Sequence, residues 1–332
     1  MHHVHTVCGP LRASAVQGPV LSHEHLALDL SRDTDPEAVL LPGTHGGRIA
    51  AELARLREEH GLALVIELSC RGMGRDPQAL RRISQTSGVA VVTATGWYHE
   101  AFHPPELAAA DPHQLTAILV DEIEHGIGRT GIRPGVIGEV GSHRDQPTDA
   151  ERHVLTAAAH AAAATGRSVA THAHLGRGGP AQLEILTSAG LPAHRASIGH
   201  QDLLDDPAVH RELASAGAYV AFDTIGKENY TADSTRLRLL LALLEAGHAD
   251  QVLLSCDISR HRYLRSEGGQ GYGHLFRSFL PKARAAGIDD DTIDAMTRRN
   301  PLRFLLGSQV KRVTRRRSCS WSTPSMPATW VW

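Results

Sequence analysis

The chain has 332 residues, of which 42% are hydrophobic, and its formal net charge at pH 7 is -2. This length suits one large domain, because α/β barrels commonly use about 250 residues or more as a single unit. The near-zero charge gives no reason to expect binding to nucleic acid or to a membrane surface. The 22 histidines are unusually many and need an explanation.

The cysteines and the chain start indicate where the protein resides. The four cysteines are scattered and form no CxxC pair, so we expect reduced thiols in a cytoplasmic protein. No run approaches the roughly 20 apolar residues of a membrane span. The N-terminus also lacks the charged-then-apolar pattern of a signal peptide.

Short apolar runs alternate with segments of helical spacing along the chain. Eight runs are predicted to be strands: 20–28, 62–69, 89–96, 135–141, 167–173, 196–200, 218–224 and 251–257. Helical spacing is clearest in 48–61, 149–166 and 234–247. This alternation predicts an α/β fold with a parallel sheet, closed into a (β/α)8 TIM barrel in a single domain. The alternative is a doubly wound open sheet, which is disfavoured because no glycine-rich nucleotide-binding loop follows the first strand.

The composition changes at the end of the predicted barrel domain, which covers residues 8–308. Five of the seven residues from Lys311 to Arg317 are basic, and apolar periodicity stops. We expect residues 309–332 to form a disordered tail. A basic arm for an anionic partner is the alternative.

Imidazoles and carboxylates stand at the carboxyl-terminal ends of five predicted strands. His23 and His25 are two residues apart and therefore share one face of the first strand. The fourth, fifth, sixth and eighth strands end with Glu139, His172, His200 and Asp257. Barrel active sites lie at this end, where buried polar groups are costly unless they are paired or bind a metal. Four histidines and two carboxylates exceed one tetrahedral site, so the pattern predicts two divalent metal ions that share a carboxylate.

These residues, in this order and spacing, resemble the phosphotriesterase-like family of the amidohydrolase superfamily. The matching segments are LSHEHLALDL, GRDP, ATGWY, GEVGS, THAH, IGHQDLLDD, AYVAFDTIGK, LSCDISR, GGQGYGHL and NPLRFL. FDTIGK and DISR are similar to the phosphotriesterase homology subgroup in particular. The resemblance spans about residues 10 to 306 and implies a homodimer.

The resemblance also implies a role for each ligand residue. His23, His25 and Asp257 would hold the more buried metal ion. His172 and His200 would hold the more exposed ion, and Glu139 would bridge the two. Phosphotriesterases themselves carry a carboxylated lysine at the bridge, so a glutamate here does not imply hydrolysis of organophosphate triesters.

The predicted activity is hydrolysis of an ester, lactone, amide or phosphoester bond in a small molecule by a hydroxide that bridges the two metals. Asp257 is the candidate catalytic residue, as the proton acceptor that then protonates the leaving group; a ligand role alone is the alternative. Zinc is the expected metal, with manganese, iron, cobalt and nickel as alternatives. The competing functions are a mononuclear deaminase-type amidohydrolase and a metal-containing binding protein without turnover.

Residues near the strand ends are candidates for contact with the small-molecule substrate. These are Trp97, Tyr98, His174, Lys227 and Arg260, with His99 beside the first two. A lysine or arginine there would favour a substrate with a carboxylate or phosphate. The glycine-rich segment 268–274 is predicted to be a mobile loop over the mouth. Glu24 is predicted to be structural and to point away from the metals.

Overall fold

The computed structural model describes residues 2–105, 107 and 110–308, and its parallel strands form a ring. They occur in two groups, ordered β13-β12-β11-β10-β9-β8 and β3-β6-β7. β7 and β8 are two halves of one strand on either side of Thr93. At the other junction, Ser22 Oγ donates to the carbonyl oxygen of Leu254 over 2.9 Å. The ring is therefore closed with eight strand positions, which confirms the predicted (β/α)8 barrel and excludes an open sheet.

The strands are short and fall within or overlap the predicted runs. They are β3 (Val20–Glu24), β6 (Leu64–Glu67), β7 (Ala90–Val92), β8 (Ala94–Thr95), β9 (Val136–Ser142), β10 (Val169–Ala173), β11 (Ala196–Ile198), β12 (Tyr219–Phe222) and β13 (Val252–Leu254).

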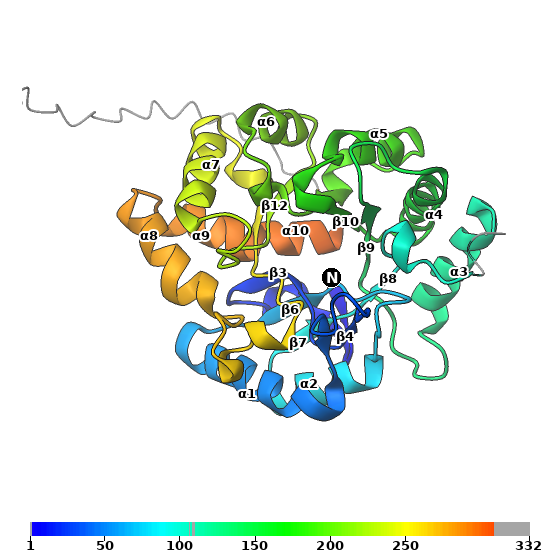
Figure 1. Cartoon of the computed structure of the whole chain (residues 1–332), viewed down its shortest axis with the longest axis horizontal. Coiled ribbons are helices and arrows are strands. Elements are labelled where there is room, and N and C mark those ends of the chain that lie inside the picture. Colours follow the sequence, from blue (N-terminus) through cyan, green and yellow to red (C-terminus); the bar gives the residue numbers. More distant parts are fainter. Residues whose placement is uncertain (1, 106, 108–109, 309–332) are drawn as a thin grey trace, which may run out of the picture.

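Helices surround the strands in chain order, as Figure 1 shows. They are α1 (Pro42–His60), α2 (Pro77–Ser87), α3 (Pro112–His125), α4 (Asp149–Thr165), α5 (Gly179–Ser188), α6 (Pro207–Ser215), α7 (Asp233–Glu245), α8 (Leu280–Ala285), α9 (Asp290–Asp294) and α10 (Asn300–Leu306). Residues Leu275–Phe279 and Ala295–Arg299 form π-helical turns that lead into α8 and α10. A capping box at Thr148 and Glu151 starts α4, and Gly166 in the left-handed conformation ends it.

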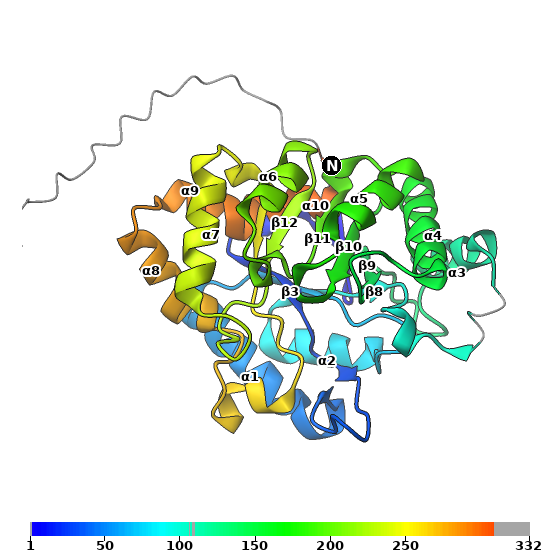
Figure 2. The same cartoon turned by 45° about the horizontal axis from the view of Figure 1, so that its top comes forward.

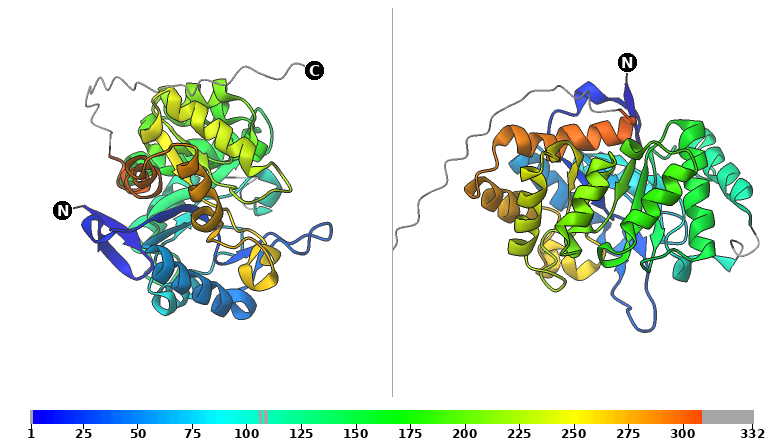
Figure 3. Two further views of the ribbon diagram at one scale, coloured as in Figure 1. Left: turned by 90° about the vertical axis from the view of Figure 1, so that its left-hand side faces the viewer. Right: turned by 90° about the horizontal axis from the view of Figure 1, so that it is seen from above.

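The amino-terminal end of the barrel is covered by the hairpin of β1 (His3–Thr6) and β2 (Gly9–Arg12) and by α10 (Figure 2 and Figure 3). Inward-facing strand residues such as Val20 and Ala170 form one apolar cluster with Phe304 and Leu305 of α10. The short hairpin of β4 (Leu28–Asp29) and β5 (Val39–Leu40) lies at the opposite end. One end of the barrel is thus sealed by apolar side chains, and the other carries the polar residues.

Two β-bulges turn the metal-ligand candidates toward the barrel axis. Along β3, Leu21 pairs with Val65 and Glu24 with Glu67, so two residues of β3 face one residue of β6. Along β9, Gly138 and Glu139 likewise face a single residue of β10. An extra residue reverses the alternation of side chains. Without the bulges, His23, His25 and Glu139 would share the outer face with Leu21 and Ile137.

Some predictions concern residues or features away from the barrel core. The tail, residues 309–332, lies outside the described residues. Within the described part, Cys8, Cys70 and Cys256 are free thiols. No described helix is long and apolar enough to cross a membrane.

Candidate metal centre

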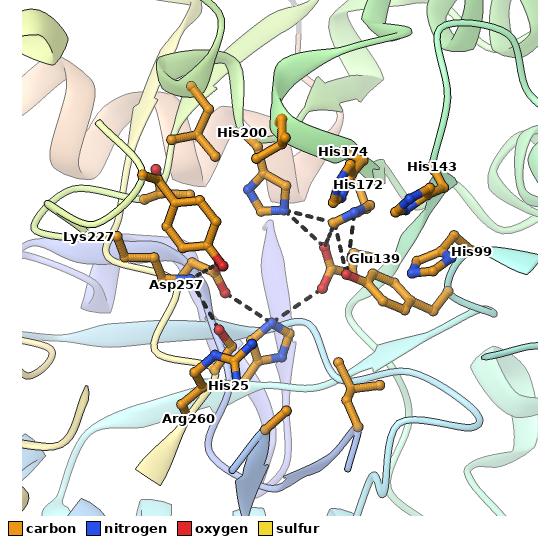
Figure 4. A pocket seen from close by; sticks show the side chains of 18 of the residues that line it. His25, His99, Glu139, His143, His172, His174, His200, Lys227, Asp257 and Arg260 are labelled. Carbon is orange, nitrogen blue, oxygen red and sulfur yellow. Dashed lines mark hydrogen bonds and ion pairs between the residues drawn. The ribbon is translucent and has the colours of Figure 1, made fainter. Parts of the chain in front are cut away.

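A cavity of about 220 Å³ opens at the carboxyl-terminal ends of the barrel strands (Figure 4). Its floor includes five of the six predicted ligand residues, namely His25, Glu139, His172, His200 and Asp257. The sixth, His23, lies beneath them and is 3% exposed. The structure therefore brings together all six residues, which span positions 23 to 257 of the chain.

Glu139 occupies the middle of this cluster. Its Oε1 lies 3.3 Å from Nε2 of His25. Its Oε2 lies 3.4 Å from Nε2 of His23, 3.3 Å from Nδ1 of His172 and 3.7 Å from Nε2 of His200. Two of the possible metal-binding groups therefore share Glu139: one with His23 and His25, the other with His172 and His200.

Asp257 joins the cluster from the end of β13. Its Oδ1 lies 3.3 Å from Nε2 of His25, and its Oδ2 accepts a hydrogen bond from the Lys227 ammonium. Lys227 also donates to Ser259 Oγ over 3.1 Å. Asp257 has a positive φ of 46°, a conformation that costs energy for a residue with a Cβ and often occurs at functional sites.

A carboxylate that the sequence analysis missed holds two of the histidines. Asp223, fully buried after β12, places Oδ2 2.7 Å from Nδ1 of His23 and Oδ1 2.8 Å from Nδ1 of His200. Ser69 Oγ similarly lies 3.0 Å from Nδ1 of His25. These partners leave Nε2 of each ring facing the cluster, as metal-binding histidines require. Asp223 also follows an apolar strand directly. The pattern that identified Glu139 and Asp257, a carboxylate at the end of an apolar strand, therefore applies to Asp223 as well.

The cluster fits bound metal ions. Nε2 of His23 and Oε2 of Glu139 are buried and have no hydrogen-bond partner in the described part of the chain, although they face each other over 3.4 Å. Leaving buried polar atoms unsatisfied is unfavourable, and a cation between them would satisfy both. Imidazole and carboxylate donors suit zinc and other divalent transition metals.

The charges of the cluster keep its carboxylates ionised. Burial raises the pKa of Glu139, but the neighbouring His23, His172 and His200 outweigh burial and leave the pKa well below its usual value. Burial likewise raises the pKa of Asp257, but the neighbouring Lys227 and His25 lower it by more, so the net shift is downward. Both side chains are thus available as anionic ligands.

Four of the five residues predicted to contact substrate line the cavity, and Trp97 does not. Tyr98, His174, Lys227 and Arg260 are lining residues. The Tyr98 hydroxyl lies 3.1 Å from Nδ1 of His172. Arg260 is ion-paired with Asp35.

Trp97 is 1% exposed and belongs to the apolar core, so its predicted position in the pocket was wrong. Its guanidinium neighbour, Arg71, lies 5.5 Å from the ring centroid. Adjacent residues of an extended chain point to opposite sides, which is why Tyr98 enters the cavity and Trp97 faces the core.

The glycine-rich segment 268–274 does not form the predicted mobile loop over the mouth of the cavity. Tyr272 within it is fully buried, and its hydroxyl donates to the carbonyl oxygen of His25 over 2.7 Å. Glu24, by contrast, has the structural position expected of it. It accepts hydrogen bonds from the backbone N–H groups of Cys256 and Ile258, each over 2.8 Å, and so ties β3 to the segment after β13.

The fold and the buried cluster define a class: barrel proteins with a histidine and carboxylate centre at the carboxyl end of the strands. The sequence model of the Phosphotriesterase family matches residues 2–305, and the chain belongs to this family. It is therefore a hydrolase whose buried residues are able to bind metal ions.

Individual relatives support this assignment. The phosphotriesterase homology protein of Escherichia coli (strain K12) is 37% identical over 86% of this chain and 97% of its own. Its crystal structure, with phosphate in the active site, has a TM-score of 0.84 over 87% of this chain and 99% of that one. The N-acetyltaurine hydrolase of Rattus norvegicus is 31% identical over 91% of this chain and 97% of its own. An organophosphorus hydrolase variant from Deinococcus radiodurans has a TM-score of 0.81 and 30% identity over 92% of this chain and 97% of that one.

Proposed function

We propose that the chain is a dinuclear metal-dependent hydrolase that cleaves an acyl bond in a small molecule. His23, His25 and Asp257 would hold one ion, His172 and His200 would hold the other, and Glu139 would be the ligand that the two sites share. The observation that carries this proposal is the position of Glu139 between the two histidine pairs, with Oε1 3.3 Å from His25 and Oε2 3.3–3.7 Å from His23, His172 and His200. When bound, two divalent ions supply an activated water and polarise the bond under attack.

The protein itself moves the protons of the proposed reaction. Asp257 accepts a proton from the attacking water and delivers it to the leaving group. Lys227 positions Asp257 by donating to Oδ2, so that Oδ1 points toward His25 and the centre of the cluster. Tyr98 holds the ring of His172 through its hydroxyl, which lies 3.1 Å from Nδ1.

The proposed substrate is an N-acyl amide, and ester, lactone and phosphoester bonds are the alternatives. The named activity of the rat relative, N-acetyltaurine hydrolysis, supports an amide bond. Leu30, Ala38 and Phe102 add apolar surface to the cavity that suits an acyl group. Phosphate in the active site of the Escherichia coli relative supports the binding of an anionic group in the same cavity.

The test combines metal analysis with a matched variant. Protein purified without chelator is analysed for metal content per chain and assayed on N-acyl amides, esters, lactones and phosphoesters. We expect about two ions per chain, with the second lost in Glu139→Gln, because an amide offers one neutral oxygen in place of two anionic ones. A single ion that is unchanged in Glu139→Gln would refute the bridge and favour a mononuclear, deaminase-type site. Two ions without turnover of any compound would favour a binding protein.

A further inference from the structure

Three histidines on one side of the cavity have no part in the proposed metal centre. His99, His143 and His174, here called the histidine wall, follow β8, β9 and β10. All three line the cavity, and Figure 4 shows them on the side opposite Lys227 and Arg260. The rings of His143 and His174 lie 3.9 Å apart between centroids, and those of His99 and His143 lie 5.2 Å apart.

The imidazole nitrogens of the histidine wall have no hydrogen-bond partner among the described residues. Nδ1 of His99 is buried there without a hydrogen bond. In the described ranges, no hydrogen bond or ion pair involves the side chain of His143 or His174; both make ring contacts only. An imidazole carries at least one N–H donor whether it is neutral or protonated, so each of the three rings offers one.

The cations on the opposite side are already engaged. Lys227 is paired with Asp257, and Arg260 with Asp35. A substrate anion that bound to either cation would compete with a carboxylate of the protein. The histidine wall meets no such competitor, because no carboxylate oxygen is hydrogen-bonded to its three rings in the described part of the chain.

We propose that the histidine wall is the subsite for a three-oxygen anionic head, such as a sulfonate or phosphonate, on the substrate. This inference rests on the proposed amide hydrolysis and names the part of the substrate that lies away from the scissile bond. Three N–H donors from three different strand ends match the three oxygens of such a head. His99 and His174 lie 5.7 Å and 5.9 Å from the ring of His172 between centroids, so a short linker joins the head to the acyl bond.

The test compares two amides that differ only in this head. N-acetyltaurine carries a sulfonate, and N-propylacetamide has a methyl group in its place. The kcat/KM of each is measured for the metal-loaded parent and for His143→Leu, His143→Gln and His160→Leu. His143 is exposed to the cavity mouth, so its replacement leaves the core intact. His160→Leu is the matched control, because this residue on α4 stacks with His113 outside the cavity.

A second arm does not depend on turnover. Binding of ethanesulfonate to the same metal-loaded proteins is measured by isothermal titration calorimetry. A hydrogen bond to a charged group accounts for about tenfold in affinity or more. We therefore expect the dissociation constant to rise about tenfold in His143→Leu, and to change little in His143→Gln, which keeps an N–H donor, or in His160→Leu.

The outcomes separate the subsite from the proposed function. A parent that prefers N-acetyltaurine at least tenfold, with the preference lost through KM in His143→Leu, supports the subsite. Equal use of both amides by the parent, or an undiminished preference in His143→Leu, overturns it. If neither amide is hydrolysed, amide hydrolysis is refuted. The titration then decides the subsite alone, and an unchanged dissociation constant in His143→Leu overturns it.

Discussion

Replacing Asp223 by asparagine changes the protonation of the proposed metal ligands while preserving their packing. The carboxylate lies against two rings at once, with Oδ2 2.7 Å from Nδ1 of His23 and Oδ1 2.8 Å from Nδ1 of His200. Asparagine keeps one acceptor oxygen and presents an NH2 group in the other position. The ring that faces this NH2 group must accept through Nδ1, so its proton moves to Nε2. That nitrogen faces Glu139 and can then no longer bind a metal.

The expected loss follows from the number of rings affected. Loss of an outer partner of a metal-binding histidine typically lowers metal affinity about 10- to 100-fold, or ~1.4–2.7 kcal/mol. Asp223→Asn disturbs one of the two rings. The affinity for one of the two ions should therefore fall by this amount, and the affinity for the other should stay the same. Metal content is measured after dialysis against a series of buffered free-zinc concentrations. Asp205→Asn is the control, because Asp205 is exposed and pairs with Arg238 on the surface, over 2.7 Å.

The reasoning is refuted if Asp223→Asn binds both ions as tightly as the parent does. It is also refuted if Asp205→Asn weakens zinc binding equally, because the effect would then come from the overall charge. A circular dichroism spectrum that matches that of the parent ensures that the comparison is made between folded proteins.

Three further predictions concern the metal ions, the sealed end of the barrel and the segment 268–274. Removal of metal with a chelator should lower the Tm, because free ion at 100 times its Kd stabilises the folded state by about 2.7 kcal/mol; an unchanged Tm in a scanning calorimeter would contradict this. Phe304→Ala should reduce the free energy of unfolding by about 3–5 kcal/mol in urea titrations, since Phe304 is 1% exposed and fills the amino-terminal end of the barrel. Tyr272→Phe should reduce the free energy of unfolding by about 1–3 kcal/mol, because the carbonyl oxygen of His25 loses its hydrogen-bond donor. An unchanged free energy in the same titration would contradict this and would show that water replaces the hydroxyl.

Much of the architecture was predictable because it depends on local patterns. Apolar runs such as 62–69 and 251–257 became β6 and β13, and the helical spacing of 149–166 became α4. The strand ends were harder to predict. His200 and Asp257 lie beyond β11 and β13 in the left-handed conformation, which sequence spacing does not reveal.

The metal-ligand candidates were recognisable as polar residues that close apolar runs. The same rule should have included Asp223, which follows Phe222 at the end of β12. Trp97 and the segment 268–274 were misplaced for a related reason. Burial of an aromatic ring depends on which way the chain turns after a strand, and the glycines around Tyr272 indicate freedom only where no tertiary contact restrains them.

The sequence by itself determined the alternation of strands and helices and the position of polar residues at strand ends. Both depend on periodicity and on neighbouring residues. The tertiary structure alone decided which way those residues point. The bulges at Ser22–His23 and at Gly138–Glu139 exist only relative to the paired strands β6 and β10, and they turn His23, His25 and Glu139 inward. The meeting of Asp223 with two rings and the histidine wall likewise required the barrel to close, because each unites side chains from different strand ends.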